Sequence, residues 1–190
     1  MPVFQLCSLV DALKELGYNC KIGSLEDILP SQRPYFERWL FHRDGFIRVL
    51  NGYIDYIGIE DIVRMGPFYN VYCLVENHNV LDTDDNAHKL LNAGPYYQLY
   101  NGKVTNMGWS GGIIADILAK DAVLSAEFVA NIMKDEVKNI RLKVANYACI
   151  IETRTWEPLE LASTFEIIDR IAYNVRQLIK TIHLGEDPSK

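Results

Sequence analysis

Gly108-Trp109-Ser110-Gly111-Gly112 is the one stretch of this chain whose residue types and spacing match a known chemistry. The pattern G-x-S-x-G presents a nucleophilic serine on a tight turn between a strand and a helix. The same residues also fit a helix start, with Ser110 as the N-cap. In that case the N–H groups of Gly111, Gly112 and Ile113 lie at the positive end of the helix dipole, where a phosphate or carboxylate binds.

A serine hydrolase needs a histidine beside its serine and a carboxylate behind that histidine. In α/β-hydrolases both partners follow the serine in the chain, and the only histidine after Ser110 is His183. The segment before Ser110 is also expected to belong to an antiparallel hairpin, whereas the hydrolase serine follows a strand of a parallel sheet. Ser110 is therefore kept as a catalytic candidate, but binding of a small anion by Ser110, Gly111, Gly112 and Ile113 is favoured over catalysis.

A second group of candidate ligands lies between residues 76 and 88. Glu76, His78 and His88 are metal-ligand types that converge on a transition metal if the turn between them folds back. The acidic segment 82–86 imitates the first ligands of an EF-hand loop, but the glycine and the glutamate that complete the loop are missing. An aspartate-rich helix start explains this segment more simply. We therefore predict no metal and no cofactor.

Composition and charge limit the class of protein. The chain has 190 residues, of which 49% are hydrophobic and 23% charged, as in globular proteins. The net charge of −6 disfavours nucleic acid as a partner, because nucleic-acid binding needs a basic face. No apolar run approaches the roughly 18 residues of a membrane span, and the start of the chain lacks a signal-peptide pattern. Without a C-x-x-C pair, the four cysteines are expected to be free thiols in the cytoplasm.

Tyrosines are concentrated in the middle of the chain. The set comprises Tyr53, Tyr56, Tyr69, Tyr72, Tyr96, Tyr97 and Tyr100. A tyrosine-rich sheet can form a ligand wall, a base-stacking platform or a protein interface. The acidic balance of residues 46–108 disfavours base stacking. The favoured expectation is that these tyrosines pack against the C-terminal helices.

The N-terminal part is expected to contain helices and then hairpins. Apolar spacing predicts a helix over 6–16, stopped by Gly17, and another over 31–42. Strands are expected at 18–22 and 69–75. Two Asn-Gly pairs, at 51–52 and 101–102, predict two-residue hairpin turns. The predicted cross-strand pairs are Val49–Ile54, Arg48–Asp55, Leu99–Val104 and Gln98–Thr105. A duplication and two independent hairpins both remain open as explanations of the recurrence.

The C-terminal part shows heptad-like apolar spacing in two segments, 126–151 and 161–182, which predicts a long antiparallel helix pair. The weak point is the segment 144–152, whose residue types also suit a strand. The second helix has too wide an apolar face for one neighbour, so a second copy is expected to cover it. The predicted interface consists of Leu161, Phe165, Ile168, Ala172, Val175, Ile179 and Ile182.

These patterns together predict an α+β fold, an antiparallel sheet with two Asn-Gly hairpins packed with N-terminal helices and a C-terminal helix pair. A single domain spans 1–190, with a helix-and-hairpin half (1–110), a helical half (111–184) and a frayed tail (185–190). The favoured function is a non-enzymatic cytoplasmic homo-oligomer, a dimer that assembles through its C-terminal helices. The alternatives are a binder of a small anion at Ser110–Ile113 and a serine hydrolase.

Overall fold

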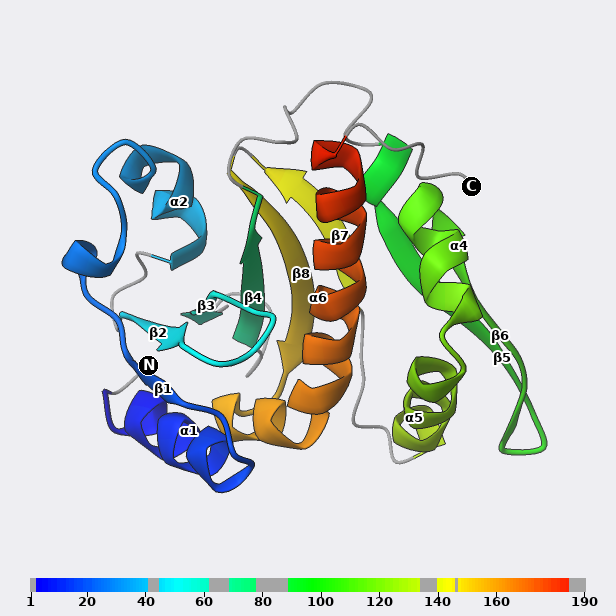
Figure 1. Cartoon of the computed structure of the whole chain (residues 1–190). Coiled ribbons are helices and arrows are strands. Elements are labelled where there is room, and N and C mark those ends of the chain that lie inside the picture. Colours follow the sequence, from blue (N-terminus) through cyan, green and yellow to red (C-terminus); the bar gives the residue numbers. More distant parts are fainter. Residues whose placement is uncertain are drawn as a thin grey trace.

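The computed structural model describes residues 3–40, 45–61, 69–77, 89–133, 140–145 and 147–184. It has the predicted α+β class, with helices on both faces of one antiparallel sheet (Figure 1). The strands lie in the order β1-β2-β3-β4-β8-β7-β5-β6. Their bounds are β1 Cys20–Ile22, β2 Phe46–Val49, β3 Tyr56–Asp61, β4 Tyr69–Glu76, β5 Ala93–Tyr100, β6 Lys103–Gly111, β7 Arg141–Ala145 and β8 Ala148–Thr155.

The larger core lies on the sheet face that carries the C-terminal helix. The helices are α1 Val3–Glu15, α2 Arg33–Leu40, α4 Ile113–Lys120, α5 Ala122–Met133 and α6 Leu161–His183, with short 3₁₀ turns η1 Leu25–Asp27 and η2 Pro158–Glu160. Figure 1 shows α6 running along the middle of the sheet, with α1 near its start and α4 and α5 beside it. Apolar side chains recur every three or four residues along α6, so one side of the helix is buried against the sheet and the other helices.

The smaller core lies on the opposite face, beneath α2. Phe36 and Leu40 of α2 pack there against Phe46, Tyr56 and Tyr72 of the sheet. None of the residues of this core comes from β5 or β6. On the α2-side face, the smaller core therefore covers the part of the sheet beneath α2 and does not extend to β5 and β6 at the other end of the sheet.

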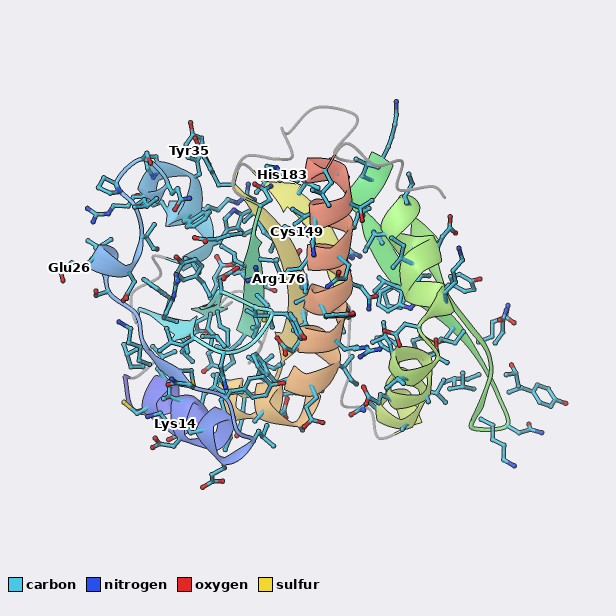
Figure 2. All side chains as sticks on the ribbon, in the orientation of Figure 1. Lys14, Glu26, Tyr35, Cys149, Arg176 and His183 are labelled. Atoms are coloured by element: carbon cyan, nitrogen blue, oxygen red, sulfur yellow. The ribbon has the colours of Figure 1, made fainter. Side chains whose placement is uncertain are left out.

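The loop between β2 and β3 is fixed by α6. Asp169 accepts hydrogen bonds from the backbone N–H groups of Tyr53 (2.6 Å) and Ile54 (3.2 Å). Burial raises the pKa of Asp169, although these two bonds oppose that effect. Two turns further along, Arg176, labelled in Figure 2, donates to Asp55 at 2.7 Å and to the Tyr53 carbonyl at 2.7 Å. The C-terminal helix therefore holds a loop more than a hundred residues away in sequence.

These contacts explain why the prediction of a two-residue turn at Asn51-Gly52 is wrong. Neither residue has the positive φ that a type I′ turn requires. The Asn51 side chain instead accepts the Asn19 N–H (2.5 Å) and donates to the Gly17 carbonyl (3.1 Å). The strand register is shifted by one residue, with Arg48 opposite Tyr56 and Val49 N–H bonded to Asp55.

The turn at Asn101-Gly102 has the two-residue geometry that Asn51-Gly52 lacks. Both residues have positive φ, 51° and 71°, and the turn joins β5 directly to β6. Leu99 lies opposite Val104, the pair expected from the sequence. Beyond it the register shifts, and Gln98 lies opposite Asn106 rather than Thr105. The additional residue in β6 is a β-bulge, which bends the hairpin.

The prediction of a long antiparallel helix pair is wrong for the first helix, the one expected over 126–151. Residues 113–133 form the two shorter helices α4 and α5, and residues 141–155 form strands β7 and β8. The region 111–184 is therefore not a helical half, because it supplies two strands to the sheet interior. The expected N-terminal helices and the strand at 69–75 are found with small shifts of their bounds. The frayed tail expected at 185–190 lies outside the described residues.

The cysteines are free thiols and three of them are buried. Cys149, labelled in Figure 2, lies in β8 under α6, and burial raises the pKa of its thiol to about 12. A thiol with such a pKa is protonated at neutral pH and packs as a small apolar side chain. Cys7 on α1 is exposed. The three buried cysteines therefore contribute to the core.

Candidate functional site

Ser110 lies within strand β6, one residue before its end. The expected N-cap role is wrong, because Gly112 is the N-cap of α4 and has the extended backbone of that position (φ −76°, ψ −171°). The neighbouring Trp109 is buried in the larger core. Successive side chains of a strand point to opposite faces, so Ser110 points to the α2-side face, where it is exposed.

One of the backbone N–H groups expected to bind an anion at the helix start is already hydrogen-bonded within the chain. The Gly112 N–H donates to the Asn92 carbonyl at 2.7 Å. Gly111 has φ +134°, and a Cβ there would lie 2.0 Å from the same carbonyl oxygen. Only glycine fits such a position. Gly111 and Gly112 are therefore explained by the close contact between the end of β6 and the segment before β5, without any ligand.

The geometry around Ser110 does not resemble a serine hydrolase. Its hydroxyl donates to the Gly94 carbonyl at 3.4 Å, and no histidine among the described residues is hydrogen-bonded to it. His183 (Figure 2) is at the end of α6, on the sheet face opposite to the Ser110 side chain. Ser110 also lacks the positive φ of a strained nucleophile turn. Nothing in the described part of the chain activates this serine.

Ser110 nevertheless lines a pocket of about 370 Å³ at the base of the β5–β6 hairpin. Residues of three neighbouring strands and of the segment before β5 form its walls. They are Asn92, Ala93, Gly94, Ser110, Gly111, Arg141 and Lys143. Two of the four predicted ligand-binding residues, Ser110 and Gly111, therefore line a cavity, whereas Gly112 and Ile113 are not among its lining residues.

The pocket is positively charged because of β7. Leu142 and Val144 are buried in the larger core, so Arg141 and Lys143 alternate with them and point to the α2-side face. Lys143 forms an ion pair with Glu152 of β8. No carboxylate among the described residues is ion-paired with Arg141, although Glu152 is its cross-strand neighbour. The sequence interpretation missed both cations because it placed them near the middle of a helix.

The candidate metal ligands are not brought together by the described residues. Glu76 accepts the Tyr56 hydroxyl at 3.0 Å, and its backbone N–H donates to Asp55 at 2.8 Å. His78 and His88 lie outside the described residues, as does the acidic segment 82–86. Within the ranges that the structure describes, no group of three or more His, Cys, Asp or Glu side chains is arranged to hold a metal ion.

The predicted interface on the C-terminal helix is buried within the chain. Leu161, Phe165, Ile168, Ala172 and Val175 are each 0% exposed, and Ile179 is 8% exposed. Ile182 is partly buried and packs against the same core. The expectation that a second copy covers this face is wrong, because the sheet on one side and helices α1, α4 and α5 on the other already cover it.

A group of exposed apolar side chains lies close together in sequence on the β5–β6 hairpin, whose residues 94–110 we call the arm. β5 pairs with β7 at Ala93–Leu142 alone among the described residues. The two strands then run past α4 and α5 to the Asn-Gly turn, which lies beyond these helices (Figure 1). The exposed fractions of Tyr96, Tyr97, Leu99 and Tyr100 are 48%, 46%, 57% and 69%. The expectation that the tyrosines pack against the C-terminal helices holds for Tyr53, whose ring contacts that of Tyr173 on α6. It does not hold for the exposed tyrosines of the arm, nor for Tyr56 and Tyr72, which are buried in the smaller core beneath α2.

Comparison with known proteins leaves the site to be interpreted from its geometry. The chain matches no protein-family model, no curated protein and no solved structure. In the described part of the chain, no helix combines the length and the apolar character needed to cross a membrane. Two features therefore remain as candidates for function, the arm and the positively charged pocket at its base.

Proposed function

We propose that the protein is a non-enzymatic assembly protein that forms a homodimer through its arm. The observation that supports this most is the outer edge of β6, a strand of nine residues (Lys103–Gly111) at the end of the sheet. No other strand in the described ranges pairs with that edge. Unpaired edges of this length offer a row of backbone donors and acceptors to another strand.

The composition of the arm supports strand pairing. Natural edge strands are usually protected by charged residues, proline or β-bulges. Lys103 is the only charged residue in β6, and β6 contains no proline. The bulge in β6 lies close to the turn, and the strand is regular from Asn106 to Gly111. Tyr97 and Leu99 point to one face of the arm and Tyr96 and Tyr100 to the other, so apolar surface is exposed on both faces. Pairing two arms along β6 would extend the two-stranded arm to a four-stranded sheet.

Charge favours a second copy of this chain as the occupant of the edge. The arm carries only Lys103 in a chain of net charge −6, so two arms meet without bringing two charged bodies into contact. Antiparallel pairing of β6 with itself around Met107 places Lys103 opposite Gly111 of the second copy. The two lysines then lie at opposite ends of the paired strands. A two-fold axis of this kind is the commonest symmetry of homo-oligomers.

The oligomeric state in solution tests this proposal. Sedimentation equilibrium at micromolar concentration should give a dimer for the unchanged protein. Asn106→Glu should give a monomer, because the proposed pairing places the two new carboxylates diagonally across from each other on adjacent β6 strands. Asn106 is exposed, so the substitution leaves the core unchanged. Gln98→Glu is the matched control, since Gln98 is exposed and lies opposite Asn106 but on β5, one strand further from the paired edge. A monomeric unchanged protein, or an Asn106→Glu protein that remains dimeric, would contradict the proposal.

A further inference from the structure

We propose that the pocket at the base of the arm binds the oxyanion of a small molecule, a phosphate or a carboxylate. Arg141 would hold two of its oxygens, while Lys143 and the Ser110 hydroxyl donate to the anion from the neighbouring positions. A guanidinium fork matches the spacing of two oxygens on either group, and such charge-assisted bonds are about twice as strong as neutral ones. The proposal does not require the dimer, because every residue it uses belongs to one chain.

The charge of the pocket differs from that of the protein as a whole. The chain has 25 acidic and 19 basic residues, yet the described residues that line the pocket include two cations and no carboxylate. Glu152 partly neutralises Lys143 from the adjacent strand, but it is not a lining residue. A concave positive site on an acidic protein concentrates small anions locally. The positive charge is therefore specific to the pocket.

Arg141 is available to a ligand. Lys143 is engaged by Glu152, whereas no carboxylate in the described part of the chain is paired with Arg141. An incoming anion therefore replaces water around the guanidinium and breaks no ion pair. The Ser110 hydroxyl is similarly available, because its hydrogen bond to the Gly94 carbonyl is long, 3.4 Å.

Gly94 supports the assignment because the fold does not require glycine there. A Cβ at this position would meet only the Ile140 carbonyl oxygen at 3.7 Å, an ordinary contact, and the backbone does not have positive φ. Gly111 on the neighbouring strand differs, since any side chain there would clash with Asn92. The missing side chain at Gly94 leaves the floor of the pocket open between Ser110 and Arg141.

Calorimetric titration tests the site with four probes at constant ionic strength, namely inorganic phosphate, phenyl phosphate, acetate and benzoate. Binding of one pair in preference to the other identifies a phosphate or a carboxylate as the ligand group. Tighter binding of the aromatic member of a pair shows that the pocket also holds the body of the ligand. The unchanged protein should bind at least one probe at millimolar concentration or below.

Variants locate the binding. Arg141→Gln should weaken the preferred probe about tenfold or more, since a hydrogen bond to a charged group is lost. Gly94→Val should weaken it comparably by filling the pocket, while circular dichroism shows an unchanged fold. Lys14→Gln makes the same charge change at the exposed end of α1, outside the pocket, and should leave binding unchanged. Absence of binding by the unchanged protein, or equal affinity in Arg141→Gln, would overturn the proposal.

Discussion

At the scale of single residues, Asp121 is the most strongly engaged carboxylate at the junction of α4, α5 and α6. Arg170 donates to it through Nε (2.7 Å) and Nη2 (3.3 Å), and Asn174 donates at 2.9 Å. It also accepts the Leu124 N–H at 3.1 Å, in the first turn of α5. Burial raises the pKa of Asp121, but these hydrogen bonds outweigh it and hold the pKa at about 2.

This lowered pKa predicts a dependence of stability on pH. The folded pKa of Asp121 lies below the value of about 4 expected for an unfolded chain, so its contribution is complete above pH 4 and is lost as the pH falls towards 2. Because Arg170 is 40% exposed, we expect a contribution of only about 1–2 kcal/mol. Urea unfolding of the unchanged protein and of Asp121→Asn should differ by this amount at pH 6 and by only about a third of it at pH 2.5. A difference that is the same at both pH values would show that Asp121 does not act through its charge.

Residue types alone identified part of the pocket. The pattern G-x-S-x-G around Ser110 and Gly111 suits a nucleophile turn or an anion-binding helix start, and both residues line the cavity. Arg141 and Lys143 were not selected, since their role depends on which face of the sheet they point to. That orientation follows from pairing between β7 and β8 and from the single contact of β7 with β5. Such long-range pairing is not contained in the local pattern that identified Ser110.

At the scale of elements, the heptad spacing of residues 126–151 is misleading, because apolar positions that repeat every three or four residues also occur across the end of α5 and the two strands β7 and β8. The alternation Arg141-Leu142-Lys143-Val144 is the period-two pattern of a half-buried strand, and the structure has Leu142 and Val144 buried. The last helix was predicted well, since its apolar face continues without interruption over 161–182. Its environment was not, because a wide apolar face does not say whether the same chain or a second copy covers it.

The burial of α6 predicts unfolding where the sequence interpretation expected dissociation. Ile168→Asp places a carboxylate in the larger core, where Ile168 is 0% exposed, and should cost at least about 3 kcal/mol of unfolding free energy. Gln177→Asp, on the exposed side of the same helix, should cost less than about 0.5 kcal/mol. Urea unfolding followed by circular dichroism measures both. An Ile168→Asp protein that keeps its stability and changes only its oligomeric state would restore the helix as an interface.

At the scale of the whole molecule, charge is unevenly distributed between the arm and the rest of the chain, which we call the body. The chain has a net charge of −6, and the arm contributes only one charge, that of Lys103. Two bodies of like charge repel each other, whereas the contact between two arms gains its free energy from apolar burial and backbone hydrogen bonds. In the proposed dimer, the interface between the arms is therefore almost uncharged, while the two negatively charged bodies repel each other over a longer range.

This distribution predicts that salt strengthens the dimer. Raising the ionic strength from about 0.01 to 0.15 M shortens the Debye length from roughly 30 to 8 Å and screens the repulsion between the bodies. The dimer dissociation constant should fall roughly two- to fivefold, because the arm has no opposite charges whose attraction is screened at the same time. Sedimentation equilibrium at the two ionic strengths measures the change, and Lys103→Gln should show a similar change, since the proposed pairing leaves Lys103 without a charged partner. A dissociation constant that rises with salt would place the contact between oppositely charged surfaces, and therefore away from the arm.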